Sequence, residues 1–229
     1  MSLLELQGIQ AFYGPSQALF GVDLVMDQGE VLALMGRNGM GKSSTIKVIC
    51  RLLKHQSGTV RFDGADIGGL AAYKAARAGL GLVPEGRRCF ANLTVYENLI
   101  AAARPGHWDF TRISELCPRL KERRDQMAAS LSGGEQQMLS IGRALMTNPR
   151  LLILDEATEG LAPVVRQEIW TAVAQLKRQT GLAILVVDKS LRERAQVADR
   201  AVILERGQSV WAGSFDALGH DVTDRYLGV

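Results

Sequence analysis

Five short apolar runs, separated mostly by stretches with helical periodicity, constrain the fold of this chain more than any other feature. None of the runs alternates apolar with polar residues, which indicates strands that are buried on both faces. Because helical patterns lie between most of them, we expect a largely parallel sheet covered by helices on both sides. The runs are Val31 to Met35, Leu80 to Val83, Leu151 to Leu154, Ala183 to Val187 and Ala201 to Leu204.

Other parts of the chain follow different patterns. The stretch from Leu3 to Gln28 and the region from Val60 to Phe62 alternate more, as antiparallel strands do. From Phe90 to Asn148 the periodicity is helical, with turn signals at Pro105-Gly106 and Pro118. The sequence therefore predicts an α/β core with an antiparallel β part near the N-terminus and a helical insertion.

Composition limits the class of protein. With 229 residues, 47% hydrophobic and 22% charged, the chain is long enough for one α/β domain of ordinary soluble composition. Its net charge of +3 gives no argument for nucleic acid, and its apolar runs are far shorter than the roughly 20 residues of a membrane helix. No basic stretch followed by an apolar core opens the sequence, so we expect no secretory signal. Cys50, Cys89 and Cys117 are widely spaced, which favours reduced thiols over disulfides or a zinc site.

The first apolar run leads directly into residues 36–43, GRNGMGKS, which we call the phosphate loop. It fits the phosphate-cradling pattern G-x-x-x-x-G-K-[ST], and an apolar periodicity predicts a helix from about Ser43 to Leu53. In this context glycines let backbone amides turn toward phosphate oxygens at the positive end of the helix. Lys42 supplies a positive charge for the β- and γ-phosphates, and Ser43 supplies a hydroxyl for Mg²⁺. The predicted nucleotide-binding residues here are Gly36, Arg37, Asn38, Gly39, Met40, Gly41, Lys42, Ser43 and Ser44.

The run from Leu151 to Leu154 ends in two carboxylates, Asp155 and Glu156. Asp155, at the tip of a buried strand, can hold Mg²⁺ through water, as in other phosphate-loop hydrolases. An acidic pair after an apolar strand can also mark a solvent-exposed turn. With the phosphate loop in the same chain, we expect Asp155 to contribute to a magnesium site.

The segment LSGGEQ, from Leu131 to Gln136, predicts the start of another helix. Ser132 and Glu135 fit a capping box, so part of the pattern is explained by helix initiation alone. Capping does not explain Gly133 and Gly134, which expose backbone amides at the positive end of the helix. We therefore expect Ser132, Gly133 and Gly134 to bind an anion, and we call these three residues the anion site.

In this order, the phosphate loop and the LSGGE motif resemble the ABC (ATP-binding cassette) superfamily of ATP-driven motors, and the resemblance covers nearly the whole chain. It implies an α/β, phosphate-loop ATPase with a RecA-like parallel-sheet core, an N-terminal antiparallel β subdomain and an inserted helical subdomain. On that basis we expect a single domain, in which residues 1–86 and 149–229 form the core with its β subdomain. Residues 87–148 would form the helical subdomain that carries the LSGGE motif.

The resemblance also implies roles for individual residues. Glu156 would orient or deprotonate the attacking water, and Lys42 would serve catalysis as well as ATP binding. The anion site would grip the γ-phosphate of ATP bound to an opposite subunit, so a second cassette would complete each active site. Tyr13 matches the aromatic residue that stacks on adenine, although a plain core or surface tyrosine fits the pattern too.

The chain departs from the family pattern at two functional positions. In the segment VPEGRR, Glu85 stands where the family usually has glutamine, and we keep it as a magnesium-side residue because a carboxylate can still ligate the ion. Lys189 occupies the position of the family's switch histidine; it could touch the γ-phosphate as a cation or be an unrelated surface lysine. The pair Arg87-Arg88 is either a solvated basic spot or part of a contact with a permease.

These departures, together with the segments VPEGRR, EGLAP and RYLGV, resemble the smaller ATP-binding subunit of bacterial importers for branched-chain amino acids. A related urea importer subunit looks similar. The resemblance implies ATP and Mg²⁺ as cofactors, and as partners two membrane permease chains, a second ATPase subunit and, indirectly, a periplasmic binding protein. It places the chain peripherally on the cytoplasmic face of the inner membrane. A non-transport ABC ATPase acting on ribosomes or DNA would need tandem cassettes or long insertions, for which 229 residues leave no room.

Overall fold

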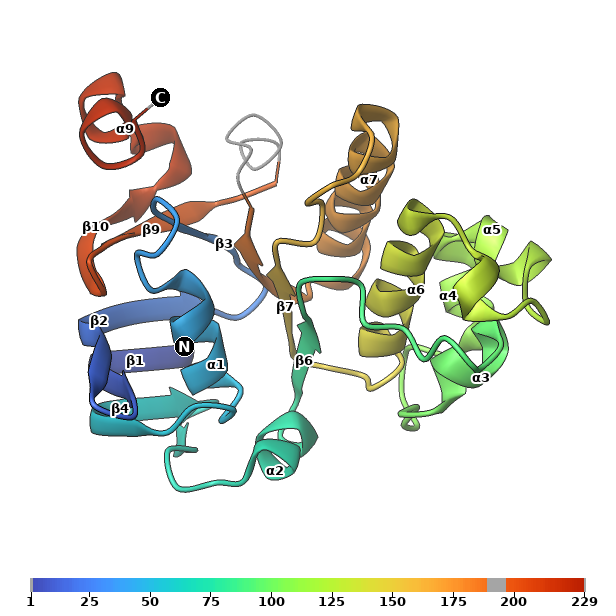
Figure 1. Cartoon of the computed structure of the whole chain (residues 1–229), viewed down its shortest axis with the longest axis horizontal. Coiled ribbons are helices and arrows are strands. Elements are labelled where there is room, and N and C mark those ends of the chain that lie inside the picture. The colour runs from blue at the N-terminus through green and yellow to red at the C-terminus, as the bar shows by residue number, and fades with distance from the viewer. Residues whose placement is uncertain (1, 189–196, 229) are drawn as a thin grey trace.

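The computed structural model describes residues 2–188 and 197–228, and it places them in two β-sheets with flanking helices (Figure 1). The larger sheet has the strand order β10-β9-β3-β8-β7-β6. Its strands from β9 to β6 pair in parallel, and the edge strand β10 pairs antiparallel with β9. These strands are β3 (Val31–Met35), β6 (Leu80–Val83), β7 (Leu151–Asp155), β8 (Ala183–Val187), β9 (Arg200–Glu205) and β10 (Gln208–Ser214). Each of the five apolar runs is a strand of this sheet, which confirms the prediction.

Strand β7 shows why the apolar runs do not alternate. Leu151 and Ile153 pack on one face of the sheet, in the core that includes α1 (Lys42–Ile49) and the smaller sheet. Leu152 and Leu154 pack on the other face, among residues of α6 (Gly133–Leu145) and α7 (Pro163–Thr180). Both faces of β7 are therefore buried, and a side chain of either orientation must be apolar.

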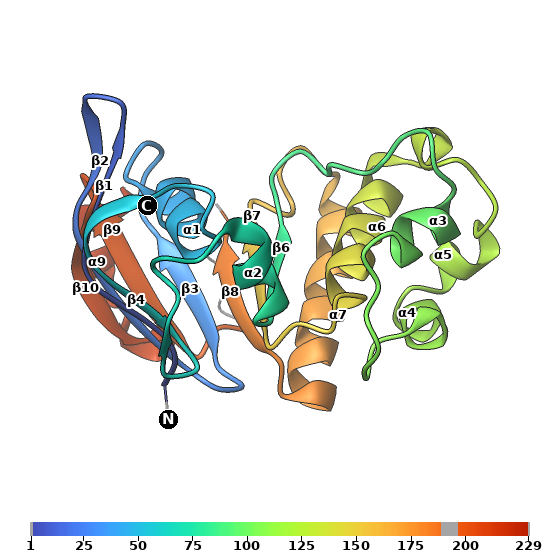
Figure 2. The same ribbon diagram turned by 90° about the horizontal axis from the view of Figure 1, so that it is seen from below.

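The smaller sheet confirms the antiparallel strands predicted near the N-terminus. Its order is β2-β1-β4-β5, and every neighbouring pair is antiparallel. The strands are β1 (Ser2–Tyr13), β2 (Ser16–Asp27), β4 (His55–Phe62) and β5 (Ala65–Asp66). Figures 1 and 2 both show this sheet at one end of the molecule and helices α3 to α6 at the other.

A helical segment lies between β6 and β7, as predicted. It contains α3 (Val95–Ile100), α4 (Phe110–Leu116), α5 (Pro118–Glu122) and α6, with a 3₁₀ turn at Ala128–Ser130. The limits of this segment as a subdomain, residues 87–148, stay a prediction. The remaining elements are α2 (Ala72–Arg77), α9 (His220–Tyr226) and a 3₁₀ turn at Phe215–Ala217. Within residues 2–188 and 197–228, no helix is long and apolar enough to cross a membrane.

Helix α1 is shorter than its apolar periodicity predicts. It ends at Ile49 rather than near Leu53, because Arg51 adopts a left-handed conformation with φ of 60°. The amides of Leu52 and Leu53 then bond back to the carbonyl oxygen of Lys47, at 2.8 and 3.0 Å. These bonds satisfy the end of the helix and turn the chain toward β4.

Asn98, in α3, is fully buried, and its side chain forms hydrogen bonds with the backbone that precedes this helix. Its Oδ1 accepts from the amide of Phe90, and its Nδ2 donates to the carbonyls of Phe90, Leu93 and Thr94. Because Asn98→Ala would leave several of these groups without partners, it should lower the free energy of unfolding by about 2–4 kcal/mol.

The control is Asn92→Ala, in the same segment, because Asn92 is exposed. Its effect should stay within about 0.5 kcal/mol. Urea unfolding of the two variants measures the difference, and equal destabilisation by both would contradict the role given to Asn98.

Candidate functional site

The phosphate loop joins the carboxyl end of β3 to the first residue of α1. Gly36 has φ of 137°, and a Cβ built on it would lie 2.4 Å from the carbonyl oxygen of Leu204. Gly41 has φ of 101°, and a Cβ there would lie 2.8 Å from Cδ2 of Leu19. Both positions favour glycine, because other residues rarely adopt these backbone angles and a Cβ would clash with a neighbouring atom.

Lys42 is buried at the start of α1, and its ammonium lies within the turn of the phosphate loop. Its Nζ donates to the carbonyl oxygens of Gly36 at 2.8 Å and Arg37 at 2.9 Å. The same carbonyls can be exchanged for phosphate oxygens, which attract the ammonium more strongly because they are charged. The lysine is thus placed where the sequence predicts a phosphate.

A cleft of about 500 Å³ opens beside this loop, and we call it the phosphate cleft. Gly36, Arg37 and Met40 belong to the loop but do not line the cleft. Met40 instead faces the β9–β10 turn, where its sulfur accepts from the amide of Arg206. The predicted residues that do line the cleft are Asn38, Gly39, Gly41, Lys42, Ser43, Ser44, Glu85 and Glu156. Residues far apart in the sequence therefore meet around one space.

The cleft also contains residues that sequence reasoning missed. Phe20, Glu159 and Arg206 line it, together with Gln17 and Ala18. Phe20 is 44% exposed although its strand buries Leu19, and a large aromatic residue at a solvent-facing strand position is the signal that could have identified it. Arg206 gave no signal, because it reaches the cleft only through the turn between β9 and β10.

Tyr13 lies at the end of β1, close to the helix that follows the phosphate loop. Its hydroxyl is 3.4 Å from Oγ of Ser44, and the ammonium of Lys47 is 5.5 Å from its ring centroid. The ring is 45% exposed, so its surface is open to a ligand. It does not line the phosphate cleft, and its stacking on adenine stays a prediction.

Asp155 ends β7 and is buried beside the phosphate loop. Its Oδ1 accepts from Oγ of Ser43 at 3.4 Å. Burial, and then the nearby carboxylate of Glu85, raise the pKa of Asp155 above its ordinary value. The hydroxyl and the two carboxylates are oxygen ligands of the kind Mg²⁺ prefers, and the crowding of negative charge would be relieved by a cation. The residues present thus fit the predicted magnesium site.

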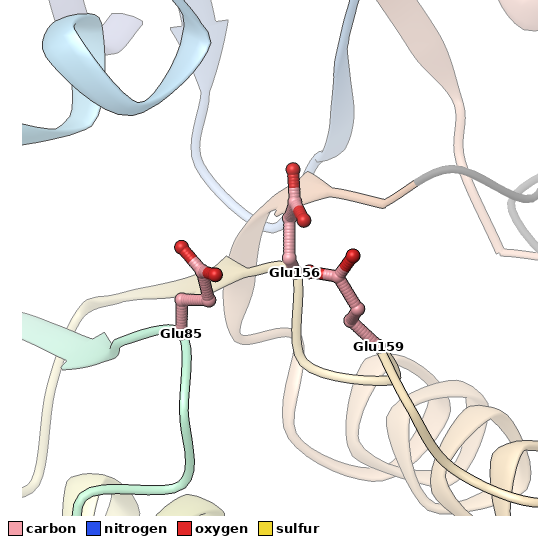
Figure 3. Close-up of side chains that lie close together, drawn as sticks. All are labelled: Glu85, Glu156 and Glu159. Atoms are coloured by element: carbon pink, nitrogen blue, oxygen red, sulfur yellow. The ribbon is translucent and has the colours of Figure 1, made fainter. Parts of the chain in front are cut away.

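A group of three carboxylates stands at the mouth of this cleft. Figure 3 shows Glu85 on the segment after β6, and Glu156 and Glu159 on the loop after β7. One carboxylate oxygen from each of them lies within 4.8 Å of the others. Glu156 adopts φ of 49°, and its amide donates to the carbonyl oxygen of Val187 at 2.8 Å. The backbone that carries the side chain predicted to handle water is therefore fixed beside the phosphate loop.

The anion site lies elsewhere, at the start of α6. Oγ of Ser132 accepts from the amide of Glu135 at 3.3 Å, and the Glu135 carboxylate accepts from the amide of Ser132 at 2.9 Å. The predicted capping box is thus confirmed. Ser132 and Gly134 line a hollow of about 700 Å³ between α7 and the helical segment, and none of the three anion-site residues lines the phosphate cleft.

The charge of Glu135 does not oppose an anion at this helix end. Burial would raise the pKa of Glu135, but hydrogen bonds with Ser132 and the charge of Arg123 outweigh it and lower the pKa. The carboxylate is paired with Arg123 at 2.7 Å.

Lys189, the residue at the position of the switch histidine, lies outside the described residues. The residue before it, Asp188, is buried and accepts from Oγ1 of Thr158 at 2.5 Å. Asp188, Thr158 and Glu156 share a small cavity of about 140 Å³. The strand that leads to position 189 therefore ends next to the acidic group, and the role of Lys189 stays a prediction.

Comparison with known proteins bears on the family and the fold of the chain. A family model described as ABC transporter matches residues 19–159. The high-affinity branched-chain amino acid transport ATP-binding protein BraG of Pseudomonas aeruginosa is 40% identical, over 99% of this chain and 100% of its own length. The lipopolysaccharide export system ATP-binding protein LptB of Haemophilus influenzae is 32% identical, over 100% of this chain and 98% of its own. Among solved structures, the ADP conformation of MJ1267, an ATP-binding cassette of an ABC transporter, matches with a TM-score of 0.86 at 27% identity, covering both chains fully.

Because the pKa of Asp155 is raised, the stability of the protein without nucleotide or Mg²⁺ should depend on pH. Between the ordinary pKa and the raised one, the folded state binds more protons than the unfolded state, so stability should fall as pH rises through that window. Asp155→Asn removes the charge and should therefore raise Tm at neutral pH.

The gain should shrink as the pH falls below the raised pKa and vanish below the ordinary pKa, where the wild-type carboxyl is protonated in both states. Thermal unfolding at several pH values measures it. Asp125→Asn, at a carboxyl that is 94% exposed, is the control and should change Tm little. A lower Tm for Asp155→Asn at neutral pH would contradict the electrostatic account.

Proposed function

The chain belongs to the ABC transporter family of ATP-hydrolysing subunits, and we propose that it drives the import of branched-chain amino acids through partner permeases. The observation that carries the proposal is the 40% identity to BraG, which covers essentially the whole of both chains. The segments VPEGRR, EGLAP and RYLGV support the same subgroup.

Two other cargoes have some support. LptB belongs to a lipopolysaccharide export system and matches at 32% identity, eight percentage points below BraG over a similar length. The sequence pattern of VPEGRR, EGLAP and RYLGV also resembles a urea importer subunit. We favour branched-chain amino acids because the higher identity and the motif pattern agree.

In the proposed mechanism the phosphate loop binds the β- and γ-phosphates of ATP. Backbone amides of the loop and the positive end of α1 face the phosphates, and the ammonium of Lys42 moves from its loop carbonyls to phosphate oxygens. Ser43, Asp155 and Glu85 would hold Mg²⁺, which when bound neutralises charge on the phosphates. We assign adenine stacking to Tyr13, whose hydroxyl is 3.4 Å from Oγ of Ser44 near the start of α1.

Glu156 is the residue we assign to the attacking water. It lies in the phosphate cleft, and the bond from its amide to Val187 fixes the backbone from which the carboxylate extends. A carboxylate at this point can accept a hydrogen bond from water and take its proton as the water attacks the γ-phosphorus.

A second cassette is part of the proposal, because the anion site does not line the phosphate cleft of its own chain. The amides of the two glycines at the start of this 13-residue helix have no acceptor within residues 2–188 and 197–228, so they are available to an anion. Two cassettes arranged head to tail would place each anion site against the γ-phosphate bound by the other. ATP would then hold the pair closed, and hydrolysis would let it open.

A permease would receive that motion in a groove between α2, β6 and the helical segment. The groove encloses about 390 Å³ and is lined largely by apolar side chains. Leu52, Tyr73 and Phe90 line it and are 59%, 58% and 48% exposed, which is unusual for large apolar residues unless a partner covers them. A short helix of a permease, on the cytoplasmic face of the inner membrane, is the occupant that the transporter family implies. A periplasmic binding protein would act on the permease from the other side.

The first test concerns hydrolysis. Glu156→Gln keeps the shape of the side chain and removes the base, so ATP turnover of the reconstituted transporter should fall by about 10²–10⁴-fold. ATP should still bind, and a closed pair of cassettes should accumulate. Near-normal turnover would remove Glu156 from the reaction.

The second test concerns partner and cargo. Pull-down of the tagged chain from membranes should recover permease chains and a second ATPase subunit, and ATPase activity should rise with a loaded binding protein. Uptake of labelled leucine, isoleucine or valine into proteoliposomes should depend on ATP. Uptake of urea instead, or recovery of lipopolysaccharide export components, would replace the cargo; recovery of ribosomes or DNA alone would overturn the transporter proposal.

A further inference from the structure

The segment that connects β6 to α3 contains a backbone conformation that demands an explanation. Gly86, Arg87 and Arg88 all have positive φ, at 82°, 66° and 42°. Two consecutive arginines in the left-handed region are unfavourable and persist only where surrounding contacts fix them. Such a conformation commonly serves to aim a side chain.

The contacts that fix this segment come from α6. The guanidinium of Arg143 donates to the carbonyl oxygen of Arg88 at 2.6 Å, and Sγ of Cys89 donates to the carbonyl oxygen of Gln136 at 3.1 Å. The amide of Arg88 also bonds to the carbonyl of Gly86 at 2.7 Å. The segment is therefore attached to the helix that starts with the anion site.

This backbone conformation directs the side chain of Arg87 toward the start of α6. Its guanidinium lies against Gly133: a Cβ built on Gly133 would be 2.7 Å from Nη1 and 2.8 Å from Cζ. A Cβ built on Gly160, in the loop after the acidic pair, would be 4.0 Å from Nη2. Within residues 2–188 and 197–228, the structure contains no hydrogen bond or ion pair of the Arg87 side chain.

Two backbone amides beside this guanidinium have no hydrogen-bond acceptor among the described residues. The capping box uses the amides of Ser132 and Glu135, and the first bond of the helix uses the amide of Gln136. The amides of Gly133 and Gly134 have no acceptor in the part of the chain that the structure describes. A cation and two amide donors thus converge at this helix end, and the carboxylate of the same turn, Glu135, is paired with Arg123.

We propose that Arg87 is a further residue of the composite active site, and that its guanidinium binds γ-phosphate oxygens of the ATP held by the partner cassette. The inference rests on the proposed pairing of two cassettes. As water adds to the γ-phosphorus and the bond to the β–γ bridging oxygen breaks, the electron pair passes to ADP. Arg87 transfers no proton; it stabilises the phosphoryl oxygens, for which a planar guanidinium is better suited than an ammonium.

The position of Arg87 makes the proposal testable through the two active sites of the pair. One site contains this chain's phosphate loop, and the other contains this chain's anion site and Arg87. In the reconstituted transporter, Arg87→Ala should lower turnover by about 10- to 100-fold, the loss expected for one charge-assisted contact. ATP binding by the isolated subunit should change less than about twofold, because its own phosphate cleft is intact.

A double-mutant cycle identifies the site on which Arg87 acts. Arg87→Ala should add nothing to Ser132→Arg, which already disables the same site, and its effect should multiply with that of Lys42→Ala, which disables the other. Arg87→Lys should recover part of the turnover. Arg119→Ala, which removes an equal charge from a 65% exposed side chain near α6, should leave turnover unchanged.

Three results with Arg87→Ala would overturn the proposal: unchanged turnover, weakened ATP binding by the isolated subunit, or a full effect on top of Ser132→Arg. An unaltered thermal unfolding curve excludes misfolding as the cause of a loss. The measurements are ATP hydrolysis and nucleotide binding. They test the role of Arg87 even if the transported substrate is not a branched-chain amino acid. Normal turnover in Ser132→Arg would reject the pairing itself and the proposal with it.

Discussion

Backbone pairing of β7 with β6 on one side and β8 on the other is the interaction on which the site depends. Val83 pairs with Leu154 and Asp155 pairs with Val187 in parallel register, so the segments that follow these strands leave the sheet at the same edge. The bond from the amide of Glu156 to Val187 extends this pairing by one residue. Because all these bonds join main-chain atoms, they fix the backbone positions from which the carboxylates extend, whichever side chains surround them.

Unfavourable features are concentrated at this edge. Asp155 is buried with a raised pKa, Glu156 has a positive φ, and three glutamates crowd one opening. The two large cores that pack on either face of the sheet supply the stability that tolerates them. In the proposed mechanism this arrangement is useful, because a cation and a phosphate relieve in the bound state the repulsion present in the free one.

Local patterns were enough to predict the elements that carry the site. The apolar runs predicted the parallel strands because burial on both faces leaves no polar position, and the Ser132–Glu135 spacing predicted the capping box because its bonds lie within four residues. Long-range contacts were not predictable in this way. Arg87 reaches Gly133, and Arg206 reaches the phosphate cleft, only after the chain has folded, and no periodicity marks such contacts.

Gly36 and Gly41, the first and last glycines of the phosphate loop, differ in whether a second substitution could make room for a side chain. At Gly41 the nearest obstacle is the end of the Leu19 side chain, so a smaller residue at position 19 would remove the worst clash. The backbone angle and the Cα of Gly207, 3.3 Å from the added Cβ, would still resist the change. At Gly36 the obstacle is the carbonyl oxygen of residue 204, which every amino acid carries. No neighbouring substitution can compensate there, so the first glycine of the loop can change only if the path of β9 changes with it.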